Sequence, residues 1–227
     1  MSLFDAFDLE GAIDRVGAEV GVPLTSEQVA ALAAHARAVD GCNERLHLTA
    51  IRDPKAFVQR HVSESLVGAA LLDATLGGTL VDLGSGNGYP GIPLALARPG
   101  LIPVLVESSP RKAEFLSRAL SVSGLGGGRV LQSNVQRPSD LEPVGPIAVL
   151  ATRAMGGWER LLPKLASVVS KEGCLLVWAG DGIDEIARRS SWDRWRRVAE
   201  RPLPSLERGR VVQFAPACFF GWPKSEV

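Results

Sequence analysis

The sequence predicts an α/β protein in which a doubly wound, mostly parallel sheet of seven strands follows an N-terminal helical cap. Residues 79–97 have the pattern of a buried strand, a glycine-rich turn and a helix, which is the nucleotide-binding corner of an open α/β sheet. From residue 79 onward strand and helix patterns alternate, whereas residues 1–75 have only helix patterns. Because such alternation is typical of a parallel sheet covered on both faces, we expect a cap over 1–75 and a sheet domain over 76–227.

Three helices are expected in the cap. Apolar residues at helical spacing predict the first within residues 1–20. The sequence Thr-Ser-Glu-Gln at 25–28 has the pattern of a capping box and begins a second helix that runs to about residue 42. Aspartate followed by proline at 53–54 supplies an N-cap and a first-turn proline, which predicts a third helix over about 54–72.

The sheet domain begins with a strand at Thr79–Leu83 that leads through Gly84, Gly86 and Gly88 into a helix beginning near Pro90. Glycine permits positive φ and removes the Cβ atoms that keep a ligand away from the backbone. Proline suits the first turn of a helix because it lacks an N–H and its φ is fixed near the helical value. This turn is the candidate ligand site, and a plain βα connection is the alternative.

The remaining elements follow the same alternation. Further strands are expected at 103–107, 129–133, 147–151, 174–179, near 195–200 and near 210–215. Helices are expected from 110 to 124, along 158–169 and over 181–190. Two prolines and a glycine, Pro202, Pro204 and Gly209, join the last two strands. This connection is consistent with a hairpin, which places one antiparallel strand in an otherwise parallel sheet.

Composition indicates a soluble intracellular protein. The chain has 227 residues, about one large domain with a cap, and 46% of them are hydrophobic. No run approaches the roughly 18–20 apolar residues that span a bilayer, and the acidic N-terminus lacks the basic region of a signal peptide. Three cysteines, Cys42, Cys174 and Cys218, are too few and too far apart for a disulfide framework or a zinc site. We expect a cytoplasmic monomer without a metal, and Cys174 in the core.

The charge distribution leaves an RNA partner open. The net charge is zero, which argues against a nucleic-acid partner, but eight arginines lie within residues 188–210. These arginines are candidates for phosphate contacts, with Trp192 and Trp195 as stacking surfaces. The alternative is a solvated helix end with both tryptophans in the core.

Two acidic residues at strand ends bear on the identity of the nucleotide ligand, and only the first of them, Asp82, discriminates. Gly86, Gly88 and Gly91 also satisfy the dinucleotide pattern G-x-G-x-x-G. Asp82, at the end of the first strand, disfavours a pyrophosphate and suits the ammonium and sulfonium of S-adenosylmethionine. Glu107, at the end of the second strand, suits the two ribose hydroxyls of either ligand, or is a solvent-facing strand end.

Four stretches carry a specific resemblance. They are LTAIRDP at 48–54, RH at 60–61, VDLGSGNGYPGIPLA at 81–95 and the Arg153-Ala154 pair after the fourth strand. Together they resemble the small-subunit rRNA methyltransferase G family, also called glucose-inhibited division protein B, over about residues 43–180. The resemblance implies a class I, Rossmann-like fold and S-adenosylmethionine-dependent methylation of N7 of a guanine in the 530 loop of 16S rRNA, on the small ribosomal subunit or its assembly intermediate.

The resemblance also implies roles for single residues. Gly84, Gly86 and Tyr89 would line the cofactor, and Glu107 with Ser108 would hold its ribose. Val135 and Gln136, after the third strand, would bind the adenine, and Arg153 would face the cofactor and the target. Three residues differ from those usual in the family: His47 replaces Asn, Gln136 replaces Glu, and Cys42 replaces Trp.

Methylation of guanine N7 needs no general base, because N7 carries a lone pair in the neutral base. Alignment of N7, methyl and sulfur is therefore the main task of the protein. The fourth strand ends in ATRAM, without the N/D-P-P-Y/F motif that grips an exocyclic amine and without a Pro-Cys nucleophile. Arg153 is expected to orient guanine O6 or the cofactor carboxylate. A surface salt bridge is the alternative.

A cationic segment precedes the glycine turn. Arg45, Arg52, Arg60 and His61 are candidates for a lid that contacts the target nucleotide or its phosphates. The alternative is an ion-pair cluster of Arg52, Asp53 and Arg60 that fixes the cap on the sheet, with His61 as a packing residue. Three aromatic residues near the C-terminus, Phe219, Phe220 and Trp222, have no assigned role beyond packing onto the sheet.

Three other functions remain open from the sequence. The first is a methyltransferase for another RNA or a small molecule. The second is an NAD(P)-dependent oxidoreductase, and the third is a non-catalytic ribosome-assembly factor that retains the pocket.

Overall fold

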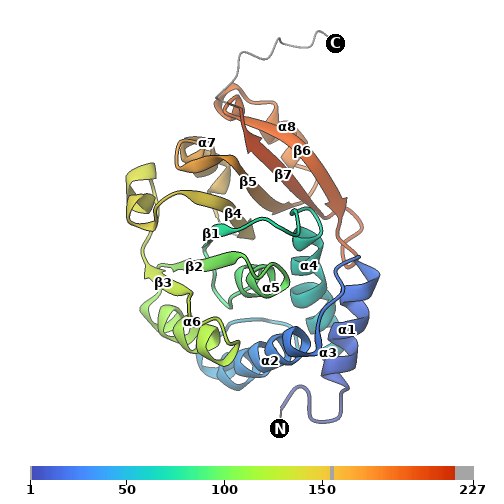
Figure 1. Cartoon of the computed structure of the whole chain (residues 1–227). Helices are drawn as coiled ribbons and strands as arrows, with labels where there is room; N and C mark the ends of the chain where they lie inside the picture. Colours follow the sequence, from blue (N-terminus) through green and yellow to red (C-terminus); the bar gives the residue numbers. More distant parts are fainter. Residues whose placement is uncertain (1, 154–155, 218–227) are drawn as a thin grey trace.

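A seven-stranded mixed sheet forms the centre of the computed structural model, which describes residues 2–153 and 156–217. The strand order is β3-β2-β1-β4-β5-β7-β6 (Figure 1). The strands are β1 (Gly78–Leu83), β2 (Leu101–Glu107), β3 (Arg129–Gln132), β4 (Ile147–Arg153), β5 (Val169–Ala179), β6 (Trp195–Pro202) and β7 (Arg210–Pro216). β7 pairs antiparallel with both β5 and β6, whereas the pairs among β1–β5 are parallel. The predicted hairpin and the single antiparallel strand are confirmed.

Helices cover both faces of the sheet. Successive residues of β1 point to opposite faces, so Leu80 belongs to one hydrophobic cluster and Val81 to the other. The helices along this part of the chain are α5 (Gly91–Ala97), α6 (Pro110–Val122), α7 (Trp158–Leu165) and α8 (Ile183–Ala187), with short 3₁₀ turns at Pro138–Val144 and Ser190–Trp192. The helix α8 is shorter than the helix expected over 181–190, and β5 begins at Val169, five residues before the expected start at 174.

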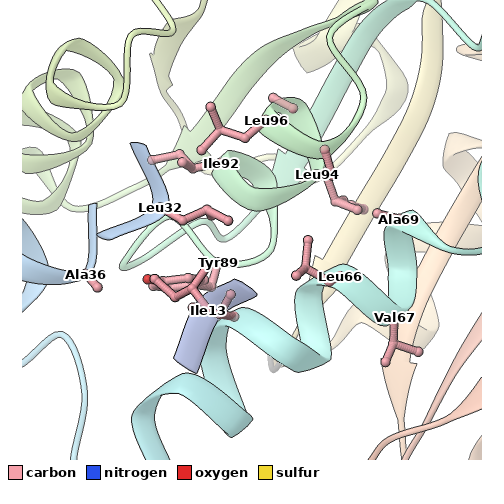
Figure 2. Close-up of a cluster of buried hydrophobic side chains, with 14 of the residues drawn as sticks. Ile13, Leu32, Ala36, Leu66, Val67, Ala69, Tyr89, Ile92, Leu94 and Leu96 are labelled. Atoms are coloured by element: carbon pink, nitrogen blue, oxygen red, sulfur yellow. The ribbon is translucent and has the colours of Figure 1, made fainter. Parts of the chain in front are cut away.

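The cap helices are α1 (Leu9–Glu19), α2 (Ser26–Leu46), α3 (Pro54–Phe57) and α4 (Glu64–Ala69). Among them α2 packs on α5 and α6 and α4 packs on α5, and Figure 2 shows side chains of α2, α4 and α5 that meet in this interface. The capping box is present: Gln28 N donates to Thr25 Oγ1 and Thr25 N donates to Gln28 Oε1. Gln28 Nε2 also donates to the Leu96 carbonyl of α5, at 2.7 Å. One polar side chain thus begins α2 and fastens it to the sheet domain.

The third cap helix differs from the single regular helix that was expected. Residues Val58–Ser63 between α3 and α4 form a π turn, η1, and the helix ends at Ala69. π turns insert an extra residue and shift the side chains that follow, and they are frequent at functional sites. Arg60 and His61 lie within this turn. The sequence has no local signal for it.

The expectation that Trp192 and Trp195 offer stacking surfaces is wrong. The two residues are 1% and 7% exposed and pack in the cluster on the face opposite the cap. Their indole N–H groups donate to the Glu159 and Leu162 carbonyls, at 3.1 and 2.9 Å. Both tryptophan rings therefore contribute apolar surface to the core, and the one polar atom of each ring is hydrogen-bonded.

Other expectations concern the core, the membrane and the chain ends. Cys174 is buried, as predicted, and burial raises the pKa of its thiol to about 11. Within the described ranges no helix has the length and apolar character needed to cross a bilayer. Ala154, Cys218 and the aromatic residues Phe219, Phe220 and Trp222 lie outside the described residues.

Candidate functional site

The glycine-rich turn follows β1 as predicted, and its three glycines adopt positive φ. The N–H groups of Gly84 and Ser85 both donate to the Val106 carbonyl at 3.0 Å, which ties the turn to β2. At Gly88 a Cβ atom would lie 2.8 Å from His35 Nε2, because α2 packs directly against the turn. At Gly86 the nearest described atom would be 3.7 Å away. The cap side of the turn is thus tightly packed, while the Gly86 side is open.

Asp82 lies beneath this turn at the carboxyl end of β1. Its side chain is buried, and Oδ2 accepts a hydrogen bond from Gly91 N at the beginning of α5, at 3.1 Å. Oδ1 is buried without a hydrogen-bond partner among the described residues. Burial raises the pKa of this carboxyl to about 6. The helix end that binds a pyrophosphate in dinucleotide enzymes is therefore occupied here by a carboxylate.

Glu107 lies at the carboxyl end of β2, on the other side of the turn, and is 8% exposed. Its Oε2 accepts from Gly86 N at 3.0 Å, and its Oε1 accepts from Ser109 N at 2.8 Å and from Ser108 Oγ at 3.4 Å. The carboxylate thus connects the glycine turn to the beginning of α6. Glu107 is a buried strand end, so the alternative of a solvent-facing one is wrong.

The two residues expected to bind adenine follow β3, next to β2 in the sheet. Val135 is half-buried and packs against the cluster beneath the sheet, and Gln136 is exposed. The backbone N–H of Gln136 donates to Asp140 Oδ2 at 2.9 Å. Together with the exposed Ser108, these residues lie near the same carboxyl edge as the glycine turn. Their adenine and ribose contacts stay predictions.

Arg153, at the end of β4, is bound to the cap. Its guanidinium donates to the Arg60 carbonyl at 2.7 Å and to His61 Nδ1 at 3.0 Å, and it lies 3.6 Å from Glu64 Oε2. Its side chain is 15% exposed and that of Glu64 is 3% exposed. Burial lowers the pKa of Arg153, and the Glu64 carboxylate opposes that shift. The alternative of a surface salt bridge is wrong, because the pair is buried.

His61 holds Arg153 through one ring nitrogen and Thr49 through the other. Because arginine only donates, Nδ1 must accept, so the ring proton is on Nε2 and faces Thr49 Oγ1 at 2.9 Å. Burial and the neighbouring Arg153 charge lower the pKa of His61 to about 3. His61 is therefore a neutral packing residue that positions Arg153. Direct contact of His61 with RNA stays a prediction.

Tyr89 lies between two histidines rather than at an open surface. Its ring stacks on His61 and His35, with centroids 4.9 and 4.4 Å apart, and its hydroxyl is buried without a partner among the described residues. His35 Nε2 contacts the Asn87 carbonyl of the turn at 2.8 Å. Sequence reasoning missed His35 because its partners are about 50 residues away. A histidine on the apolar face of α2 was the available signal.

The predicted ion-pair cluster of Arg52, Asp53 and Arg60 is not the one that forms. Arg52 is exposed and donates to the Thr49 carbonyl, and Asp53 caps α3 by accepting from Ala56 N. Arg60 instead pairs with Glu64, with Nε 3.4 Å from Oε1. Glu64, which also faces Arg153, was missed. Its spacing of four residues from Arg60 on a helix was the signal.

A cavity of about 340 Å³ opens between the cap and the carboxyl ends of β4 and β5. Three charged side chains line it: Arg60, Glu64 and Arg153. Apolar walls come from Trp178 of β5 and from Leu203 and Leu206 in the loop between β6 and β7, among others. The volume falls in the range of sites for small ligands, about 300–1,000 Å³.

The remaining cationic candidates are divided. Arg45 is exposed on α2. Among the eight arginines of 188–210, four pair with acidic residues: Arg189, Arg197, Arg208 and Arg210. The other four include the arginines at positions 188, 194 and 196, which are exposed. The phosphate contacts predicted for this segment stay a prediction.

The fold is similar to the folds of two proteins of known structure. MtNAS, in complex with MTA and tNA, has a TM-score of 0.58 at 17% identity, covering 92% of this chain and 74% of that chain. The ribosomal protein L11 methylase from Lactobacillus delbrueckii subsp. bulgaricus has a TM-score of 0.55 at 12% identity, covering 69% and 78%. The α/β fold is the Rossmann-like fold of class I methyltransferases, as predicted.

Sequence relatives identify the family. Residues 28–195 match the rRNA small subunit methyltransferase G family. Ribosomal RNA small subunit methyltransferase G of Sorangium cellulosum is 33% identical over 205 residues, covering 89% of this chain and 85% of the relative. The protein of that name from Stenotrophomonas maltophilia is 38% identical over 177 residues, covering 77% and 81%. The chain belongs to the rRNA small subunit methyltransferase G family, as the resemblance predicted.

Buried titratable groups of the site make stability depend on pH. Burial lowers the pKa of His35 to about 4 and that of His61 to about 3, from 6.5. The unfolded chain therefore binds more protons than the folded protein below pH 6.5, so the free energy of unfolding falls as pH falls. Asp82 acts in the opposite direction below pH 6, because its carboxyl protonates in the folded protein first.

We expect the free energy of unfolding to fall by about 3 kcal/mol between pH 7 and pH 5, since each of the two histidines contributes a loss of about 2 kcal/mol and Asp82 contributes a gain of about 1 kcal/mol. In a His35→Gln variant the loss should shrink to less than about 1 kcal/mol, because His61 and Asp82 nearly cancel. Urea denaturation at pH 7, 6 and 5 measures both. An unchanged pH dependence in the variant would contradict the assignment.

Proposed function

We propose that this protein transfers a methyl group from S-adenosylmethionine to N7 of a guanine in the 530 loop of 16S rRNA. Membership in the rRNA small subunit methyltransferase G family supports the reaction class. The observation that carries the choice of cofactor is the pair of buried carboxylates, Asp82 and Glu107, on the two sides of the glycine turn. The small ribosomal subunit or its assembly intermediate is the proposed partner, and the cytoplasm the proposed location. The protein is proposed to act as a monomer.

The residues present fit this cofactor. The buried Asp82 Oδ1 has no hydrogen-bond partner in the part of the chain that the structure describes, lies next to an open turn and favours a cationic ligand. Gly84, Gly86 and Tyr89 are assigned to line the cofactor. Glu107 and Ser108 are assigned to hold its ribose, and Val135 and Gln136 to bind its adenine. S-adenosylmethionine supplies an electrophilic methyl on a sulfonium when it is bound.

The chain itself contributes orientation and exclusion of water rather than proton transfer. Guanine N7 needs no deprotonation, and His61, the histidine next to Arg153, has both ring nitrogens in hydrogen bonds. Arg153 is held by two cap groups and faces the cavity, which suits a donor to guanine O6. In-line alignment by such fixed donors is catalysis by proximity and electrostatics. Arg45, Arg52 and Arg60 are assigned to the RNA.

An NAD(P)-dependent oxidoreductase is the weaker candidate. A dinucleotide pyrophosphate needs free N–H groups at the beginning of the helix, and the first of these, Gly91 N, donates to Asp82. The carboxylate at this position also repels a phosphate. A methyltransferase for another RNA or a small molecule shares every one of these features, so the substrate must be tested directly.

The deciding experiment incubates the purified protein with tritium-labelled S-adenosylmethionine and either naked 16S rRNA or assembled small subunits from a strain that lacks the protein. Label in the rRNA, mapped by mass spectrometry to N7 of one guanine in the 530 loop, supports the proposal. Label at another atom or another RNA would replace the substrate assignment. If the protein binds the cofactor but labels neither the naked 16S rRNA nor the assembled small subunits, the result would favour the non-catalytic assembly factor.

A Glu107→Gln variant tests the cofactor assignment. We expect its Kd for S-adenosylmethionine to rise at least about tenfold, because a carboxylate that accepts charge-assisted hydrogen bonds is lost. Isothermal titration with S-adenosylmethionine and, separately, NAD measures the effect and the cofactor class. The control is Glu172→Gln, an exposed glutamate of β5. Equal affinities of both variants for the cofactor would reject the role of Glu107.

A further inference from the structure

The cavity next to Arg153 contains a carboxylate that the proposed chemistry does not use. Glu64 lies on its wall with a side chain only 3% exposed. Its Oε1 contacts Arg60 Nε at 3.4 Å and accepts a hydrogen bond from Ser205 Oγ of the loop between β6 and β7. Its Oε2 lies 3.6 Å from Arg153 Nη1, beyond hydrogen-bond distance. A carboxylate offers about four acceptor positions, so Glu64 retains the capacity to accept further hydrogen bonds.

The surroundings of this carboxylate suit a planar base. Trp178, Leu203 and Leu206 provide apolar walls around the charged group. The Trp178 indole N–H donates to the backbone carbonyl of Glu64 at 2.8 Å, which fixes the ring to the residue that carries the carboxylate. Enzymes that modify a base often read its Watson–Crick edge by hydrogen bonds while apolar or aromatic side chains hold its faces. The cavity therefore has both kinds of contact.

A buried carboxylate that only accepts is selective among the four bases. Guanine presents two adjacent donors, N1–H and N2–H, whereas adenine and cytosine place an acceptor beside their amino group and uracil has one donor between two acceptors. The N7 atom lies on the other edge of guanine, so a base held by N1 and N2 leaves N7 free to face a methyl donor.

We infer that Glu64 is the specificity-determining residue for the target base, and that its carboxylate accepts hydrogen bonds from N1–H and N2–H of guanine in this cavity. The inference rests on the proposed function and adds to it the residue that selects guanine. Arg60 and Arg153 place positive charge beside the Glu64 carboxylate, and the Ser205 hydroxyl fixes its Oε1 by a hydrogen bond.

The test replaces the methylated guanosine by inosine, which lacks only the N2 amino group. Small subunits are reconstituted from 16S rRNA that carries guanosine or inosine at the mapped position, and kcat/KM is measured with each. With the unaltered protein we expect inosine to be methylated about 10- to 100-fold less efficiently, the loss of one hydrogen bond to a charged group. In Glu64→Gln, the ratio between the two substrates should fall to within about threefold, because the amide has only one acceptor oxygen.

The matched control is Glu114→Gln. Glu114 also pairs with an arginine four residues away on a helix, but its side chain is 69% exposed, so the variant should keep the full preference for guanosine. Equal transfer to guanosine and inosine by the unaltered protein would overturn the inference without any variant. A Glu64→Gln variant that is slower on both substrates but keeps the ratio would overturn it too, since that is a purely structural role. Absence of methyl transfer to guanosine by the unaltered protein is a distinct result and would overturn the proposed function itself.

Discussion

An Arg153→Lys variant is expected to turn over about 100-fold more slowly than the unaltered protein while remaining folded. The lysine ammonium keeps a positive charge near Glu64. It cannot reproduce the planar fork that donates to the Arg60 carbonyl and His61 Nδ1 at the same time. The donor that we assign to guanine O6 is then no longer held in one orientation, so the loss falls on the chemical step.

The lysine variant is preferred to alanine for a structural reason. Removal of one member of a buried ion pair costs about 3–5 kcal/mol because the other charge is left uncompensated, and Glu64 is such a charge. Single-turnover methyl transfer, cofactor Kd and urea denaturation separate the effects. Arg118→Lys, which changes an exposed arginine paired with Glu114, is the control. Turnover of Arg153→Lys within threefold of the control would refute the orienting role.

A Gly88→Ala variant is expected to lower the free energy of unfolding by about 2–5 kcal/mol. Gly88 has φ +88°, where an alanine is strained, and the added Cβ would lie 2.8 Å from both His35 Nε2 and Ile92 Cδ1. The His35 atom is the one that contacts the Asn87 carbonyl, so the turn and α2 must separate to relieve the contact.

The control isolates backbone strain from packing. Gly124, after α6, has φ +71°, and no described atom lies within 4 Å of the position that an added Cβ would take. Gly124→Ala should therefore cost only about 1 kcal/mol. Urea denaturation of both variants gives the comparison. Equal losses would mean that contact between α2 and the glycine turn contributes nothing to stability.

The fold was predictable where short-range signals dominate. The capping box at Thr25, the N-cap at Asp53 and the glycine turn after β1 each involve residues within a few positions of one another. The topology followed from the alternation of strands and helices, since such connections have few alternatives. The π turn at Val58–Ser63 was not predictable, because no residue in it marks an irregular helix.

In the candidate site, too, the residues that sequence position indicates were predicted, and those that depend on long-range contacts were not. Asp82 and Glu107 were found because strand ends meet at one edge of a parallel sheet. The partners of Arg153 lie about 90 residues earlier in the chain, and no periodicity indicates such a contact. Glu64 and His35 were missed for that reason. The burial of Trp192 and Trp195 was equally undecidable, because a tryptophan suits a core and a stacking surface alike.

Arg153 belongs to a strand of the sheet, but residues of the cap orient its guanidinium. Its backbone belongs to β4, whereas the atoms that it contacts belong to the π turn and to the first residue of α4. Substitutions in residues 58–64 and at position 153 therefore act on one shared arrangement, and their energetic effects will not add. A change tolerated at one of these places depends on which residue occupies the other, so the two parts of the chain must vary together.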